Sequence, residues 1–168
     1  MPKYKPSLRM IQRIQSLLLA GVVILLTINL FVPIWSSDKG DKNFDFISVT
    51  AFSIDCGFAN TPKQASIPVY YLGSLISLCI GLSLFIIFQY KKRSLQIILC
   101  SFLTLLLLGI LGSYFIVIPK AKELMFTPEN GDYGIGYFLP ILSILLVAAA
   151  RYFIRKDDEL VKSVDRIR

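Results

Sequence analysis

The residue types that most often carry redox, metal or acid–base chemistry are scarce in this sequence. It contains three cysteines, Cys56, Cys79 and Cys100, and no histidine. A histidine general base and a histidine-ligated metal are therefore excluded. A disulfide-forming membrane enzyme needs two thiols that can meet, usually as Cys-x-x-Cys, and no pair here has that spacing. We predict no catalytic residue, no cofactor and no metal site.

Cys79 and Cys100 fall in two consecutive apolar runs that are joined by a short turn. Counted from that turn, they differ in depth by about 9 Å at about 1.5 Å per residue. A disulfide requires Cα atoms within about 7 Å, so we interpret both residues as small apolar fillers of a helix bundle. Cys56 lies in a loop, where an odd cysteine either stays free or pairs with another chain.

The most organised polar pattern is the C-terminal run 155–168, which we call the tail. As a helix it has acidic residues early and basic residues late, the order that the helix dipole favours, and an apolar stripe formed by Leu160, Val161, Val164 and Ile167. One interpretation is an amphipathic helix at the membrane interface, held by this stripe and by anionic lipid. The other is a docking surface for a protein partner. Each tail acid has a basic neighbour within a turn, which leaves no isolated carboxylate to act as a base.

Four long apolar runs must position these residues. The chain has 168 residues, 55% of them hydrophobic, against about 45–50% in a soluble domain, and its mean hydropathy is +0.65. At about 1.5 Å per residue, each run can cross a hydrocarbon core of about 30 Å. The first run is too long for a signal peptide and no cleavage site follows it, so we interpret it as an uncleaved anchor. The predicted spans are 14–35, 69–90, 95–118 and 133–154.

The positive charges predict how these spans are oriented. Four basic residues lie in the head (1–13), three in the turn 91–94 and six from Arg151 onward, which makes 13 of the 18 in the chain. The remaining five lie in two loops that also hold seven acids. Because Lys and Arg are retained in the cytoplasm, both termini are predicted to be cytoplasmic. The aromatic residues that lie near span ends, as in an interfacial belt, are Trp35, Tyr70, Tyr71, Tyr90, Tyr114, Tyr133 and Tyr137.

Two outer loops, 36–68 and 119–132, connect the spans on the other side. In the first loop, 44–54 alternates in two phases, which is typical of one bulged strand or two short strands. The second ends in a turn sequence. We therefore predict an all-α membrane protein in which 1–168 forms a single four-helix transmembrane bundle. Its outer side carries a small extracytoplasmic cap, for which short β-strands are an option.

Small residues recur along two of the predicted spans. Gly73, Ser77 and Gly81 stand at i, i+4 and i+8, and Gly109 and Ser113 repeat the spacing in the next span. Such stripes let helices approach closely inside lipid. We interpret them as helix-packing positions within this bundle, with a dimer or partner-subunit face as the alternative.

Two stretches resemble the signatures of a known family. Met10-Ile-Gln-Arg-Ile-Gln15 opens the first span, and Ala150-Arg151 with the run from Ile154 to Arg168 closes the chain. These are similar to domain-of-unknown-function family 4293, a family of four-span proteins from the Bacteroidota. The resemblance implies the inner membrane of a Gram-negative bacterium and brings no activity. Because the first matching stretch begins at Met10, translation starts either at Met1 or at Met10. The matching positions, which we predict to dock a partner, are Gln12, Arg13, Gln15, Arg151, Lys156, Asp157, Glu159, Ser163, Asp165, Arg166 and Arg168.

We expect a non-enzymatic inner-membrane protein, an accessory subunit or assembly factor whose cytoplasmic head and tail dock a protein partner. Its surroundings are the lipid bilayer, and no nucleic acid is expected. The alternative is a small transporter or membrane enzyme that acts through the bundle interior. The span centres hold no ionisable group, which argues against transport. That alternative predicts a polar cavity between the spans, lined by Asn29, Ser77 or Thr104. A claudin-like protein is matched in layout only, since the paired loop cysteines are missing.

Overall fold

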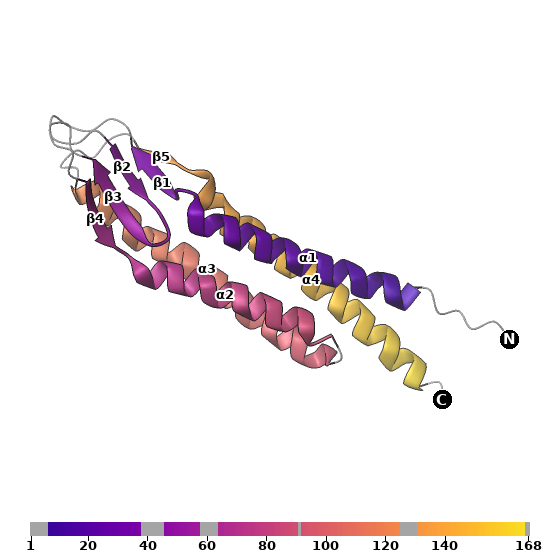
Figure 1. Cartoon of the computed structure of the whole chain (residues 1–168). Coiled ribbons are helices and arrows are strands. Elements are labelled where there is room, and N and C mark those ends of the chain that lie inside the picture. The colour runs from indigo at the N-terminus through magenta and orange to yellow at the C-terminus, as the bar shows by residue number, and fades with distance from the viewer. Residues whose placement is uncertain (1–6, 38–45, 58–63, 91, 125–130, 167–168) are drawn as a thin grey trace.

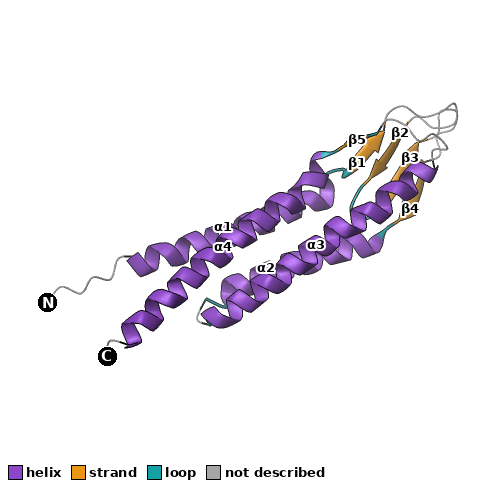
Figure 2. Ribbon diagram, turned by 180° about the vertical axis from the view of Figure 1, so that it is seen from behind, coloured by secondary structure: helices purple, strands orange, loops and turns teal. Residues whose placement is uncertain are grey.

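The computed structural model describes residues 7–37, 46–57, 64–90, 92–124 and 131–166. Four helices form an elongated bundle, and an antiparallel sheet covers one end of it (Figure 1). We call this the sheet end, and the opposite end, where the chain turns from α2 into α3, the turn end. The start of the first helix and the end of the last helix lie toward the turn end (Figures 1 and 2).

The helices are α1 (Ser7–Phe31), α2 (Tyr70–Phe88), α3 (Arg93–Leu124) and α4 (Ile135–Arg166). Each contains a stretch long and apolar enough to cross a membrane. Helix α1 packs against α2 and α4, and α3 packs against the same two, so the four close into a ring. Many large apolar side chains of all four helices are exposed, among them Leu17, Phe88, Phe115 and Leu145, as expected where the surroundings are lipid.

The sheet contains β1 (Trp35–Ser37), β2 (Phe46–Val49), β3 (Ser53–Gly57), β4 (Gln64–Pro68) and β5 (Asp132–Tyr133). All neighbours are antiparallel, in the order β4-β3-β2-β1-β5. Trp35 in β1 pairs with Val49 on one side and with Tyr133 on the other. The strand just before α4 therefore joins the strands that follow α1, although the two segments are far apart in the chain.

The predicted all-α fold class is wrong, because the five-stranded sheet is a substantial part of the structure and not a small cap. Strands form right at the helix ends. Helix α1 ends at Phe31, where Pro33 disfavours helical geometry in the residue before it, and β1 begins at Trp35. Of the two options for 44–54, the described part of this stretch has two short strands, β2 and β3, with a turn between them.

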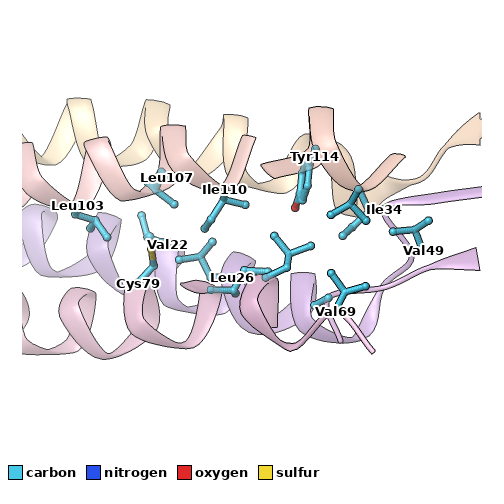
Figure 3. Packing of buried hydrophobic residues seen from close by; sticks show 14 of the residues in the cluster. Val22, Leu26, Ile34, Val49, Val69, Cys79, Leu103, Leu107, Ile110 and Tyr114 are labelled. Carbon is cyan, nitrogen blue, oxygen red and sulfur yellow. The ribbon is translucent and has the colours of Figure 1, made fainter. Parts of the chain in front are cut away.

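One hydrophobic core runs through both parts of the molecule. It extends from Cys79 and Leu103 in the bundle to Ile34 and Val49 beneath the sheet (Figure 3). Because the bundle and sheet share this core, they form one unit, and the sheet cannot unfold without exposing apolar side chains of the bundle.

Candidate functional site

A buried ion pair joins α4 to the start of α3 at the turn end. Arg93 Nη2 lies 3.1 Å from Asp157 Oδ2, and Arg93 Nη1 donates a hydrogen bond to the Asp157 carbonyl oxygen at 3.3 Å. The Asp157 side chain is 1% exposed and that of Arg93 is 20% exposed. The carboxylate oxygens have no partner aligned as a hydrogen bond, so the attraction is mainly between the two charges. A carboxylate this deeply buried needs that compensating charge.

The helical period explains why Asp157 points inward. Val147, Ala150, Ile154 and Asp157 are all buried, and steps of three and four residues place them on one helix face. Helix α4 continues through the tail to Arg166 without a break. The inward face of the bundle therefore extends into a segment whose composition is polar.

Two buried glutamines lie in the same half of the bundle as this ion pair. Gln96 Nε2 donates a hydrogen bond to the Ile86 carbonyl oxygen at 3.0 Å, which satisfies a carbonyl in the last turn of α2 and ties α2 to α3. Gln15 in α1 is 6% exposed, and its amide nitrogen has no partner. The Nε atom of Arg151 in α4 is also buried without a partner.

Gln15 and Arg151 lie at about the same level of the bundle. The Leu146 side chain is the nearest neighbour of Gly21 across the antiparallel α1–α4 contact. The turn end is reached by going backward along α1 from Gly21 and forward along α4 from Leu146. Because both helices rise equally per residue, Gln15 lies opposite the turn of α4 that holds Arg151. We call the whole set at this end the polar layer. It consists of Gln15, Arg93, Gln96, Arg151 and Asp157.

A second buried polar group lies near the sheet end. Asn29 Nδ2 donates hydrogen bonds to the Gly136 carbonyl oxygen at 3.1 Å and to Tyr114 Oη at 3.3 Å. The Asn29 and Tyr114 side chains are fully buried. These contacts connect α1, α3 and α4, and they engage the polar groups of Asn29 within the protein.

The larger of two described cavities is a groove of about 430 Å³ at the sheet end. It lies where β3 and β4 meet the start of α2 and the end of α3. Its apolar lining includes Ile54, Ile67 and Val117, and Lys120 and Glu123 add opposite charges. Its size is within the range of small-molecule sites.

The smaller cavity, of about 110 Å³, has aromatic walls that include Tyr133 and Tyr137. Beside it, Lys122 Nζ lies 5.9 Å from the centroid of the Trp35 ring, a distance that allows a cation–π attraction. Trp35 is 1% exposed, and Gly131 lies so close to its ring that a Cβ atom there would overlap it. This contact packs Gly131, the residue just before β5, onto Trp35 of β1.

The three cysteines are buried and free. Cys56 lies in β3, outside the apolar spans, and burial together with a smaller effect of the neighbouring Asp55 carboxylate raises the pKa of its thiol. Within the described part of the chain, no group of three or more potential metal-ligating side chains comes together.

The predicted docking residues differ in their surroundings. Lys156 and Glu159 are exposed, and Arg151 is partly exposed. Gln15 and Asp157 instead face into the bundle. The other predicted docking positions lie outside the described side chains: Gln12, Arg13, Ser163, Asp165, Arg166 and Arg168.

The predicted helix-packing residues also have varied neighbours. Gly73 is buried against the Phe52 ring, which belongs to the turn between β2 and β3. A Cβ atom at Gly109 would be 3.9 Å from Leu75, and one at Gly81 would have no neighbour within 4 Å. The Ser77 and Ser113 hydroxyls donate to carbonyls of their own helices.

Sequence reasoning did not find the pairing of Arg93 with Asp157. The signal for Asp157 was present, because it continues the apolar stripe of Val147, Ala150 and Ile154. Arg93 carried no comparable signal, because the spacing along one helix does not tell which residue of another helix faces it.

These features define a class of protein in which four helices are apolar and long enough to cross a membrane and an antiparallel sheet covers one end of the helix bundle. The chain belongs to the family described as Domain of unknown function (DUF4293), which matches residues 11–167. The family resemblance seen in the two terminal signatures is thereby confirmed. No curated protein matches the chain.

Proposed function

We propose that this protein is a non-enzymatic subunit or assembly factor of the bacterial inner membrane, whose head and tail dock a cytoplasmic or membrane partner. One observation carries the proposal. Helices α1 and α4 pack against each other, and both extend past the turn between α2 and α3 (Figures 1 and 2). Segments from opposite ends of the sequence thus project together beyond the rest of the bundle at the turn end.

The chemistry of this surface suits a charged partner. Arg155, Lys156 and Glu159 are exposed on α4, and charged groups at the rim of an interface favour specific association. The Arg93–Asp157 pair anchors α4 just before Glu159. A docking helix held in this way loses little conformational entropy when it binds.

The rival class, a transporter or membrane enzyme, receives less support. Neither described cavity is lined by Asn29, Ser77 or Thr104. Asn29 bonds to Tyr114 and Gly136, while Ser77 and Thr104 bond to carbonyls of their own helices. Their polar groups are already engaged, which favours a structural role for them.

Site-specific crosslinking in native membranes tests the docking surface. A photoreactive residue at Glu159 should crosslink to a protein partner, whereas one at the exposed Ser66, at the sheet end, should not give that product. Reversing two exposed charges, with Arg155→Glu and Lys156→Glu, should reduce the Glu159 product by about ten-fold or more, because like charges across an interface repel. A lone monomer that gives no crosslink at Glu159 would overturn the proposal, and an unchanged thermal unfolding midpoint would show that the variant is folded.

Thiol labelling of whole cells tests the proposed orientation. Native Cys56 is 3% exposed and its thiol pKa is raised, so it should react slowly at neutral pH, and faster only as rising pH increases the thiolate fraction. A cysteine placed at exposed Ser66 should react with an impermeant maleimide from outside. One placed at exposed Lys156 should react only after the inner membrane is permeabilised. The reverse pattern for Ser66 and Lys156 would overturn the orientation.

A further inference from the structure

The groove at the sheet end lies beside the ends of two apolar helices, the level at which lipid headgroups meet acyl chains around helices that span a bilayer. Its lining includes Tyr71, in the first turn of α2, and Val117, near the end of α3. The apolar stretches of these helices are Tyr70–Phe88 and Arg93–Glu123. The groove therefore opens beside the outermost part of two spans. This is the end of the bundle opposite the proposed docking surface (Figure 1).

Two opposite charges border this otherwise apolar groove. Lys120 and Glu123 are both exposed and both line it. They are three residues apart in α3, so their Cβ atoms are about 5–6 Å apart on one side of the helix. Among the residues that the structure describes, neither one has an ion-pair partner. One cation and one anion thus stand next to an apolar surface at the sheet end of two apolar helices.

We propose that this groove binds a phospholipid with a phosphoethanolamine headgroup. The Lys120 ammonium contacts the lipid phosphate, and the Glu123 carboxylate accepts hydrogen bonds from the primary ammonium of the headgroup. The first part of an acyl chain lies against Ile67 and Val117. A zwitterionic headgroup fits because only two methylene carbons separate its phosphate ester oxygen from its ammonium group. Its two opposite charges therefore lie close together, as those of Lys120 and Glu123 do.

A lipid fits this site better than an extended peptide added to the sheet. Strand β4 is at the edge of the sheet, and such edges can accept a further strand. However, Val69 N–H already bonds to the Phe52 carbonyl oxygen on the β3 side, so by alternation Pro68 faces the free edge. Proline has no N–H to donate there, which shortens the ladder that a peptide could form.

Native mass spectrometry of the full chain in mild detergent tests the proposal. The probes are phosphatidylethanolamine, phosphatidylcholine and phosphatidylglycerol with identical acyl chains. Phosphatidylethanolamine should be retained most strongly, because only it combines the phosphate with an ammonium that can donate hydrogen bonds. Glu123→Gln should weaken its binding by about two- to five-fold, the effect of one exposed charge pair, and should not weaken phosphatidylglycerol binding. Lys120→Gln should weaken the binding of both lipids.

Asp132→Asn is the matched control, because Asp132 is another exposed carboxylate at the sheet end but lies on β5, at the opposite edge of the sheet from β4. It should leave the binding of all three lipids unchanged. Thermal unfolding of each variant in the same detergent shows whether it is folded. Equal retention of the three lipids would overturn the proposal. So would folded Glu123→Gln and Lys120→Gln variants that bind phosphatidylethanolamine as wild type does, which is also the outcome expected if the groove takes a peptide.

Discussion

Replacing Arg93 with alanine is expected to destabilise the protein by about 3–5 kcal/mol, the usual cost of leaving a buried charge without its partner. Asp157 is 1% exposed, so water cannot replace the lost cation. Asp157→Ala should cost less, about 1–3 kcal/mol, because the Arg93 side chain is 20% exposed and can be solvated. Chemical unfolding in detergent, followed by circular dichroism, measures both values.

A double variant separates the ion pair from the packing around it. Arg93→Met with Asp157→Leu removes both charges and keeps much of the volume, and such replacements are often neutral or stabilising. It should therefore regain most of the stability lost in Arg93→Ala. Lys92→Ala is the control, because Lys92 is the exposed neighbour of Arg93 and surface substitutions usually change stability by less than about 0.5 kcal/mol.

Limited proteolysis shows where the effect of Arg93→Ala is felt. The pair joins α4 to the start of α3, so its loss should first release the end of α4. Trypsin should then cleave after Arg155 and Lys156 several times faster than in wild type, before the rest of the bundle is attacked. If Arg93→Ala and Lys92→Ala unfold and are cleaved alike, the ion pair does not anchor α4.

The helices were the most predictable part of this fold, because each is marked by its own apolar run. Hydropathy does not fix where a helix ends, however. Helix α1 stops at Phe31, before the predicted end of the first span, because Pro33 follows. Helix α4 continues to Arg166 because a mixed-charge segment can remain helical beyond the apolar run.

The sheet was harder to predict because its pairing joins distant segments. Trp35 was expected at the membrane interface, yet it is 1% exposed and belongs to a strand between Val49 and Tyr133. Nothing in the residues next to Trp35 indicates these partners. Strand register depends on which faces become buried in the folded protein, so a loop-like composition concealed two strands at the helix ends.

The polar layer shows the same limit for the candidate site. Gln15, Arg151 and Asp157 were identified from the terminal signatures, but as partner-facing residues. Gln15 and Asp157 are buried, and the partner of Asp157 comes from the start of α3. Which side of a polar helix faces inward is decided by its neighbours, and a single sequence does not contain that information directly.

The other large effect is expected at Gly136, where α4 comes closest to the end of α1. A Cβ atom on Gly136 would lie 2.8 Å from the Pro33 carbonyl oxygen and 3.0 Å from that of Val32. Both are backbone atoms, which cannot turn aside as a side chain can. Gly136 N–H also donates to the Pro33 carbonyl oxygen at 3.2 Å, and its own carbonyl accepts from Asn29 at 3.1 Å.

Gly136→Ala should therefore separate α1 from α4 and weaken both hydrogen bonds. Overpacking and the loss of a buried hydrogen bond together predict a loss of about 2–4 kcal/mol in the free energy of unfolding. This exceeds the gain of about 1 kcal/mol that alanine brings over glycine inside a helix. Chemical unfolding in detergent measures the difference from wild type.

Gly81→Ala is the matched control, because a Cβ atom there meets nothing within 4 Å. Only the helix-propensity gain remains, so this variant should be as stable as wild type or up to about 1 kcal/mol more stable. If instead Gly81→Ala is the damaging change, the small-residue stripe on α2 packs against something outside this chain. If neither variant changes the stability, the backbone of α1 and α4 can separate at Gly136 at little cost in free energy. The close contact at Gly136 would then not hold the sheet end of the bundle together.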